Sequence, residues 1–313
     1  MIWQTARFTI DLAEPKVMGI VNVTPDSFSD GAEHASPAAA LWHCEKLILE
    51  GADILDIGGE STRPGATPLP LQDELARVLP VVREAVKLGV PISVDTHKPQ
   101  VMQAVLDLGA DIINDIRALQ WCGNGVEQVS GIQHHARVET GTRRAIQAAL
   151  EEPPMAVQIV SRHPRCGVCL MHMHRDPQTM QVMPMTGDVV TQVLLFWKLI
   201  TQQLSGLGVN ISRIVLDPGI GFGKTVAQNF ELLRRQGELL AGGCPLLLGW
   251  SRKSSLAAAT RSSLATTATQ DMHDRMVPSV AAALLAVERG AAIVRVHDVR
   301  ETVQALKVLN AIK

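Results

Sequence analysis

The sequence contains no tyrosine, and aromatic residues make up only 3% of its 313 residues. Proteins that bind single-stranded nucleic acid stack the bases on aromatic side chains, of which this chain has few. Its charges nearly cancel, since 29 Lys and Arg face 31 Asp and Glu. Such a balance provides no basic surface for phosphate backbones or anionic lipid. We therefore expect no nucleic-acid partner and no membrane partner.

Long hydrophobic runs are also missing, although 46% of the residues are hydrophobic. No apolar stretch approaches the roughly 20 residues that cross a bilayer as a helix. The first twelve residues, MIWQTARFTIDL, lack the charged segment and long apolar run of a secretory signal. We expect a protein without a membrane span or a signal peptide.

Cysteine is scarce, and its number is odd. A disulfide framework uses an even number of cysteines at regular spacings, and it forms in oxidising compartments. Five scattered cysteines instead favour free thiols, so we expect a cytoplasmic protein. They are Cys44, Cys122, Cys166, Cys169 and Cys244.

Eight short apolar runs are rich in β-branched residues, and each stops at a polar or small residue. Continuous apolar character is typical of strands that are buried on both faces, as in a parallel sheet. The runs predict strands over Lys16–Val23, Asp53–Gly58, Pro91–Thr96, Ala110–Asp115, Gly167–Met173, Arg213–Asp217, Pro245–Trp250 and Ala291–His297.

Helical patterns lie between these strands, and most of them stop at a glycine, which commonly ends a helix. They predict helices over Ala38–Glu50, Leu71–Leu88, Pro99–Leu108, Val189–Leu207, Pro278–Arg289 and Val299–Ile312.

The alternation predicts an α/β protein in which eight parallel strands close into a (β/α)8 TIM barrel. An open, doubly wound sheet is the alternative for the same pattern. We expect one domain over residues 1–313, with the first twelve residues forming a small hairpin under the barrel.

One crossover is longer than a single helix needs. Between Asp115 and Gly167 the chain contains glycines, prolines, a His pair at 134–135 and an Arg pair at 143–144. Long connections of this kind are uncommon inside a compact domain. We predict an insertion at about 118–165, between the fourth and fifth strands, with a short helix over Ala145–Glu152. We assign it no role.

Ionisable and amide side chains recur where the predicted strands end. In a barrel, these ends meet at one mouth, where active sites lie. Carboxylate and amide oxygens suit the N–H edge of a flat heterocycle, and cationic groups suit a phosphate or carboxylate. The acceptors are Asp56, Asp95, Asn114 and Asp217, and the donors are Arg63, Lys253, Arg295 and His297.

Simpler explanations exist for single members of this set. Asp95 or Asp217 alone would be a helix N-cap, and His297 alone a structural histidine. Their recurrence on many strands favours a binding site. Asn22, at the end of the first strand, is suited to donate a hard oxygen to Mg²⁺ beside a phosphate.

Two other motifs fail on inspection. The segment GIGFGKT, Gly219 to Thr225, resembles a phosphate-binding P-loop, but Pro218 stands where that pattern requires glycine. The segment CGVCLMHMH suggests a zinc site, but side chains alternate along a strand, which points Cys169 away from His172 and His174. We favour neither a nucleotide triphosphatase nor a structural zinc site.

Eight segments together resemble the dihydropteroate synthases, the folate-pathway enzymes that sulfonamides inhibit. They cover most of the chain in order: MGIVNVTPDSFSDG, GADILDIGGESTRPGA, PISVDTHKP, GADIINDI, LMHM, LDPGIGFGK, GWSRKS and IVRVHDV. The resemblance implies a transferase that condenses 6-hydroxymethyl-7,8-dihydropterin diphosphate with p-aminobenzoate. The products would be 7,8-dihydropteroate and pyrophosphate, with Mg²⁺ as cofactor and a homodimer as the assembly.

The resemblance also implies roles for individual residues. The pterin would contact Asp56, Asp95, Asn114, Met171, Asp217, Phe222 and Lys253. The diphosphate would contact Asn22, Arg295 and His297, with Asn22 also on Mg²⁺. The p-aminobenzoate would contact Phe28, Thr62, Arg63, Pro64 and Ser251. The residues expected to matter most for catalysis are Arg63, Asp95, Asp217 and Lys253. Loops after the first and second strands would close over the site.

Two alternatives come from other classes. A corrinoid-type methyltransferase domain uses a similar pterin pocket, but it needs neither the STRPG loop nor the Ser-Arg-Lys triplet that this chain has. A non-catalytic barrel that binds a partner is the second, because fold alone does not define function. The intact set of Asn22, Arg63, Asp95, Lys253 and His297 argues against it, whereas the long insertion keeps it open.

Overall fold

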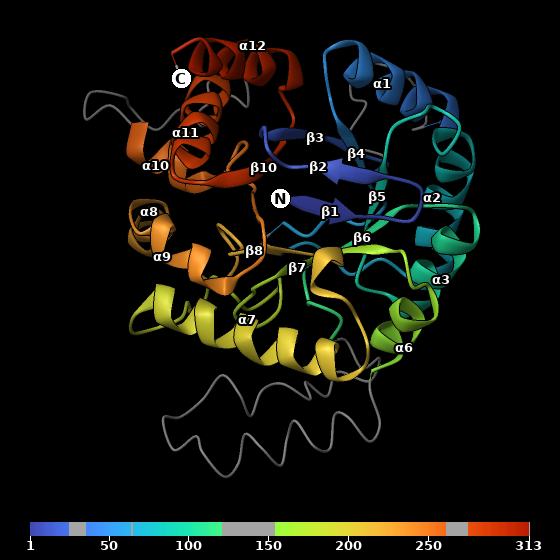
Figure 1. Cartoon of the computed structure of the whole chain (residues 1–313), viewed down its shortest axis with the longest axis horizontal. Coiled ribbons are helices and arrows are strands. Elements are labelled where there is room, and N and C mark those ends of the chain that lie inside the picture. Colours follow the sequence, from blue (N-terminus) through green and yellow to red (C-terminus); the bar gives the residue numbers. More distant parts are fainter. Residues whose placement is uncertain (25–35, 64, 121–153, 261–274, 313) are drawn as a thin grey trace.

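The protein is a closed barrel of eight parallel strands (Figure 1). The computed structural model describes residues 1–24, 36–63, 65–120, 154–260 and 275–312. The last strand pairs with both its predecessor and the first barrel strand, so the sheet closes and the open alternative is wrong. The barrel strands are β3 (Lys16–Asn22), β4 (Ile54–Gly58), β5 (Ile92–Asp95), β6 (Ile112–Asp115), β7 (Gly167–Met171), β8 (Ile214–Asp217), β9 (Leu246–Leu248) and β10 (Ala291–Val296).

Helices form a ring around the barrel, as Figure 1 shows. All six predicted helices are confirmed within a few residues. No helix in the described ranges is long and apolar enough to cross a membrane. The helices are α1 (Pro37–Leu49), α2 (Leu71–Ala85), α3 (Pro99–Asp107), α6 (Met155–Arg162), α7 (Val189–Gly206), α8 (Val226–Arg234), α9 (Gln236–Leu239), α10 (Ser254–Thr260), α11 (Met276–Glu288) and α12 (Val299–Asn310), with 3₁₀ turns at Ile211–Arg213 and Leu240–Gly242.

Four of these helices, α6, α8, α9 and α10, were not predicted from the sequence. The start of α8 does carry a local signal. The Thr225 side chain accepts from the Gln228 backbone, and the Gln228 side chain accepts from the Thr225 backbone. This reciprocal capping box follows the pattern Thr-x-x-Gln, which sequence analysis can detect.

The predicted insertion at about 118–165 includes the crossover helix that connects β6 to β7. Helix α6 lies within the range 118–165 and packs against α3 in the outer ring. Arg213 holds its C-terminal end, because its guanidinium donates to the carbonyls of Val160 and His163. The predicted helix over Ala145–Glu152 lies outside the described residues.

The predicted N-terminal hairpin is present. Strands β1 (Ile2–Gln4) and β2 (Thr9–Asp11) pair antiparallel. They cross the end of the barrel that is nearest the viewer in Figure 1. Trp3 is fully buried, and its indole Nε1 donates to the Arg213 carbonyl at 2.9 Å. Its ring packs on the apolar residues inside the barrel. The hairpin therefore closes the end opposite the strand C-termini.

The barrel interior changes from apolar to polar along the strands. Near the hairpin, one cluster contains Met18, Ile54, Ile112, Cys169, Val215, Leu247 and Ile293. Side chains two residues apart point to the same side of a strand. Two residues beyond these positions stand Ile20, Asp56, Asn114, Met171, Asp217, Gly249 and Arg295. The candidate site residues therefore form the layer directly above the apolar interior.

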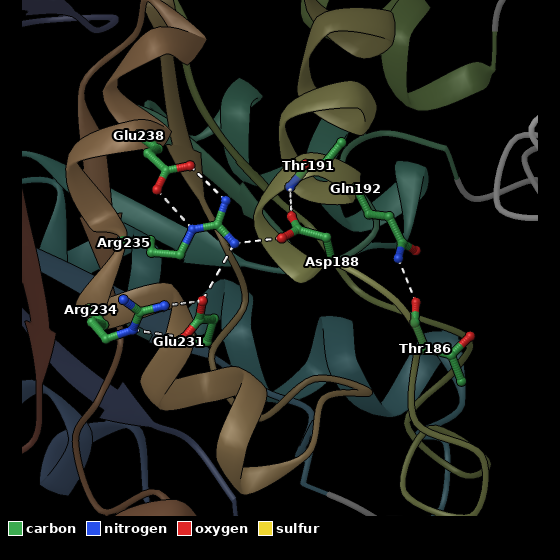
Figure 2. A network of polar contacts seen from close by, with 8 residues as sticks. All are labelled: Thr186, Asp188, Thr191, Gln192, Glu231, Arg234, Arg235 and Glu238. Atoms are coloured by element: carbon green, nitrogen blue, oxygen red, sulfur yellow. Dashed lines mark hydrogen bonds and ion pairs between the residues drawn. The ribbon is translucent and has the colours of Figure 1, made fainter.

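A network of ion pairs joins the helices outside β7 and β8, as Figure 2 shows. The Arg235 guanidinium, between α8 and α9, lies 2.5 Å from Asp188 and 2.6 Å from Glu238. Asp188 also caps α7 by accepting from the Thr191 backbone at 2.6 Å. These hydrogen bonds lower the pKa of Asp188 to about 2. The network fixes the start of α7 to the two helices that follow β8.

Candidate active site

Arg295 lies at the centre of the polar layer. Its Nε donates to Asp56 Oδ2 at 2.6 Å, and its Nη2 donates to Asp95 Oδ2 at 2.7 Å. Asn114 Nδ2 donates to the same Asp56 oxygen at 3.1 Å. The structure therefore brings three predicted acceptors together around a guanidinium that we had grouped with the diphosphate contacts.

The other oxygen of Asp56 has no hydrogen-bond partner among the described residues, although it is buried. Buried carboxylate oxygens nearly always accept a hydrogen bond, because leaving one unpaired costs free energy. This oxygen belongs to the polar layer at the C-terminal ends of the strands, next to the barrel mouth. It is suited to accept an N–H from a ligand that enters there.

The ionisation of this cluster depends on the pairing. Burial raises the pKa of Asp95 to about 7, against the lowering effect of Arg295 and with a further rise from the neighbouring Asp56. Burial alone would lower the pKa of Arg295, but the two carboxylates raise it above its usual value. Arg295 thus stays charged, and it donates to the carboxyl groups of both Asp56 and Asp95.

A second pair of opposite charges flanks the first. Asp217 ends β8, and its Oδ1 accepts from the Gly219 backbone at 2.7 Å. Burial raises the pKa of Asp217, while this hydrogen bond and the Lys253 ammonium oppose the rise. Burial lowers the pKa of Lys253 to about 8, and Asp217 opposes that change. The Lys253 amine also lies 4.2 Å from the centre of the Phe222 ring.

An apolar wall adjoins these charges. One cluster of buried residues contains Ile116, Met171, Met173, Met180 and Phe222. Met171 is the register partner of Asp217 in the β7–β8 pair, so the wall begins next to a carboxylate. A flat ring could pack on this wall while its polar edge meets the acceptors.

The Ser-Arg-Lys triplet forms a turn after β9. Arg252 has a positive φ of 59°, which an ordinary side chain adopts only in tight turns. Its guanidinium pairs with Asp298 at 2.7 Å, and its backbone N–H donates to the Ser279 hydroxyl. This turn separates Ser251 from Lys253 and anchors the residue between them.

Ser251 contacts His297 at the end of β10. The Ser251 hydroxyl lies 2.9 Å from His297 Nδ1 and accepts from the His297 backbone N–H at 3.1 Å. The pKa of His297 lies well below its usual value, mainly because of burial and also because of the cations Arg252, Arg295 and Arg63. The imidazole is therefore neutral and acts as a hydrogen-bonding group.

The remaining predicted residues stand on or beside loops. Asn22 is the last residue of β3 and is half-buried at the mouth. Thr62 and Arg63 follow β4 in a loop that contacts the segment after β7 through a hydrogen bond from Gly65 to Pro177. Phe28, Pro64 and the predicted first lid lie outside the described residues.

Sequence reasoning missed a buried ion network at the base of the Thr62–Arg63 loop. Lys98 Nζ lies 2.6 Å from Glu60 and 2.5 Å from Glu74. Glu74 also accepts from the Thr96 hydroxyl, and Glu60 accepts from the Leu69 backbone. The network ties both ends of the 60–69 loop to α2 and to the start of α3. The charged residues of ESTRPGA and VDTHKP were its only signal.

Together these features suit a flat heterocycle with a donor edge and an anionic substituent. Carboxylates would accept from the edge, the apolar wall would cover the ring, and the cations Lys253, Arg295 and Arg63 would offset negative charge. The fold and the site thus define a barrel enzyme that binds a polar ring at its mouth.

Comparison with known proteins gives the family. A family model described as "Pterin binding enzyme" matches residues 18–297. The dihydropteroate synthase of Neisseria meningitidis serogroup B is 44% identical over 316 residues, which cover 99% of this chain and 97% of the relative. The chain belongs to the pterin-binding enzymes and, within them, to the dihydropteroate synthase family.

Two solved structures support the same assignment. The dihydropteroate synthase of Xanthomonas albilineans with 4-aminobenzoic acid has a TM-score of 0.79 and 41% identity, and the match covers 97% of this chain and 95% of that one. The Burkholderia cenocepacia enzyme, complexed with 7,8-dihydropteroate, has a TM-score of 0.77 and 43% identity, covering 99% and 96%.

The Lys98 network predicts a large loss of stability for Lys98→Met. Removing the cation would leave two buried carboxylates without their partner, which typically costs about 3–5 kcal/mol. Denaturant unfolding would measure the change in the free energy of unfolding. Lys87→Met is the matched control, because Lys87, just after α2, forms an equally short but exposed pair with Glu84. We expect the control to change stability by less than about 0.5 kcal/mol. Equal losses in the two variants would contradict the buried-charge argument.

Proposed function

We propose that this chain catalyses the dihydropteroate synthase reaction of folate biosynthesis. It would join 6-hydroxymethyl-7,8-dihydropterin diphosphate to p-aminobenzoate and release 7,8-dihydropteroate and pyrophosphate. The observation that carries the proposal is the polar layer built around Asp56, Asp95, Asn114 and Asp217, next to an apolar wall. The relatives bound to 7,8-dihydropteroate and to 4-aminobenzoic acid agree with both halves of the reaction.

The pterin would lie in the polar layer. Asp217, Asn114 and the unpaired oxygen of Asp56 would accept hydrogen bonds from its ring nitrogens. Lys253 would donate to the carbonyl side of the ring, and Phe222 and Met171 would pack against its faces. Asp95 would contribute a further acceptor and hold Arg295 in place.

The reaction exchanges one bond for another at the pterin methylene. The C–O bond to the diphosphate breaks, and the electron pair leaves with pyrophosphate. The carboxylates around the ring favour the positive charge that develops on the pterin, and Arg295 and His297 stabilise the departing anion. The arylamine nitrogen then forms the C–N bond and loses a proton. Because an arylamine is neutral near pH 7, it needs positioning more than a base.

The p-aminobenzoate would bind at the mouth, beside the loop after β4. Thr62, Arg63 and Ser251 are its proposed contacts within the described residues. Arg63 is exposed and influences His297 electrostatically, so it lies near the diphosphate end of the site. Phe28 and Pro64 complete this pocket in the proposal.

We propose Mg²⁺ as the cofactor, with Asn22 as its protein ligand. Mg²⁺ prefers oxygen donors and is often held by few protein ligands together with substrate phosphates and water. The half-buried Asn22 amide at the mouth has the right chemistry for that role. The ion would neutralise charge on the diphosphate, and Asn22 would orient it.

The central test is release of pyrophosphate. Purified protein with the pterin diphosphate, p-aminobenzoate and Mg²⁺ should release pyrophosphate in step with 7,8-dihydropteroate. Lys253→Ala should lower kcat/KM by roughly 100-fold, as expected when one well-placed donor is lost. Lys307→Ala, at an exposed residue in the last turn of α12, is the control and should stay fully active. Folded protein that releases no pyrophosphate would refute the proposed function.

The role of Mg²⁺ has a separate test. Chelation with EDTA should abolish turnover, and added Mg²⁺ should restore it. Asn22→Ala should raise the Mg²⁺ concentration needed for half-maximal rate by about tenfold or more. Asn310→Ala, near the C-terminus of α12, should leave that concentration unchanged. A rate that changes neither with EDTA nor with the Asn22 substitution would contradict the proposed Mg²⁺ site.

We also propose that the protein is a homodimer in the cytoplasm. The exposed apolar side chains Val277 and Leu285 on α11 support a contact with a second copy. Among the described cysteines, Cys44 and Cys166 are free and buried, and burial raises the pKa of each thiol to about 12, in keeping with a reducing compartment. Cell fractionation would check the location.

The dimer proposal predicts the mass of the protein in solution. Light scattering at micromolar concentration should give twice the chain mass, because an apolar face of this kind is stabilised by burial. Leu285→Glu should shift the mass toward the monomer. Leu49→Glu, at an exposed apolar residue on α1, should leave the dimer intact. A monomer for the unsubstituted protein would contradict the proposal.

A further inference from the structure

Lys224 is a buried lysine to which neither the family resemblance nor the proposed mechanism gives a role. Only 2% of its surface is exposed. It ends the segment GIGFGK, whose glycines and lysine resemble a phosphate-binding loop. In such a loop, the lysine would reach toward a phosphate. In this protein the amine instead contacts backbone carbonyls.

The Lys224 amine donates to three backbone carbonyls. They belong to His172 at 3.2 Å, Gly219 at 3.0 Å and Phe222 at 3.1 Å. An ammonium group has three N–H donors, so all of them are used within the protein. The hydrogen bonds join the loop that follows β8 to the residue directly after β7.

The loop and its neighbour approach each other unusually closely. Gly219 has a φ of 69°, and a Cβ there would lie 2.0 Å from the His172 carbonyl oxygen. Gly223 has a φ of 68°, and its Cβ would lie 2.3 Å from the His174 carbonyl oxygen. Glycine at both positions lets the loop backbone approach the segment after β7. The Lys224 amine contacts one of these crowded carbonyls, that of His172, together with those of Gly219 and Phe222.

The clamped segment carries two proposed pterin contacts. This segment, the 217–223 loop, contains Asp217 and Phe222, and Met171 directly precedes His172. Lys224 holds Phe222 through its backbone carbonyl, while the ring of Phe222 lies 4.2 Å from the Lys253 amine. A change in the position of these carbonyls would therefore move the acceptor and the apolar wall together.

Two opposing effects act on the charge of Lys224. Burial lowers the pKa of Lys224 to about 7, and the nearby Asp217 carboxylate opposes the change. A buried ammonium costs free energy unless its donors are satisfied. An apolar side chain would avoid that cost, but all three carbonyls would lose the Lys224 donor. The carbonyls of Gly219 and Phe222 would keep a backbone N–H donor, and that of His172 would keep none among the described residues. The lysine is therefore suited to fixing the loop rather than to filling space.

We propose that Lys224 is a positioning residue for the pterin site, which it shapes by clamping the 217–223 loop onto the end of β7. This inference rests on the proposed function, because it concerns the same pterin pocket. Lys224 itself touches no substrate. Its effect should appear mainly in the affinity for the pterin.

Lys224→Met tests the proposal, because methionine has a similar length and no donors. The measurement is the dissociation constant of 6-hydroxymethyl-7,8-dihydropterin diphosphate, by calorimetry with Mg²⁺ and without p-aminobenzoate. We expect the dissociation constant to rise at least tenfold. Lys224→Gln retains part of the donor set, and we expect it to fold and to raise the constant at least threefold, so the test does not depend on one variant.

Arg213→Met is the matched control. Arg213 is also a buried cation, and it also donates to three backbone carbonyls, those of Val160, His163 and Cys166. It lies at the opposite end of β8, next to the hairpin. We expect its substitution to lower thermal stability as much as Lys224→Met, while the pterin dissociation constant changes less than twofold.

The outcomes separate the two hypotheses. If the unsubstituted protein binds no pterin diphosphate, the proposed function fails. If it binds and the folded Lys224 variants bind equally well, the positioning role is wrong. If Arg213→Met weakens pterin binding as much as Lys224→Met, the effect is general loss of stability, and the positioning role is again wrong.

Discussion

The alternation of side chains in a closed parallel barrel is the constraint on which this site depends. Each strand points every second residue into the interior. Because all eight strands run in the same direction, residues at matching positions form layers. The hairpin seals the apolar layer from below, with Trp3 packed into it. Two residues further along, the same alternation aims Asp56, Asn114 and Arg295 toward the open mouth.

Placing charges in that layer requires pairing. Asp56 and Asp95 share the guanidinium of Arg295, and Asp217 lies near Lys253. An isolated charge at such depth would cost several kcal/mol, but these partners offset much of the cost. The pairing leaves Asp56 with one oxygen unpaired among the described residues. In the proposed function, an N–H group of the pterin ring donates a hydrogen bond to this oxygen.

A further set of buried polar groups holds the loops around this layer. Lys224 fixes the loop after β8, and Lys98 fixes the loop after β4 through Glu60 and Glu74. The surface network around Arg235 does the same for α7, α8 and α9 (Figure 2). Lys224, Lys98 and Arg235 thus act on the protein's own backbone and carboxylates. Such anchoring suits a site whose groups must keep fixed positions.

Most of the fold could be read from the sequence. The eight apolar runs and the glycine stops gave the strands and six helices to within a few residues, because burial on both faces leaves a continuous apolar signature. Helices α9 and α10 are short and carry no strong pattern, and we overlooked the capping signal of α8. The Met155–Arg162 part of the predicted insertion is the barrel's own crossover helix, α6.

The sequence by itself determined the order of the strands and the kind of residue at each strand end, since these follow from local periodicity and composition. It also carried the family resemblance. Only the tertiary structure decided which of these groups meet. It paired Arg295 with Asp56, although 239 residues separate them, and turned the Lys224 amine onto the protein's own carbonyls. Closure of the barrel brings distant strands into contact, and no local pattern encodes the distances that result.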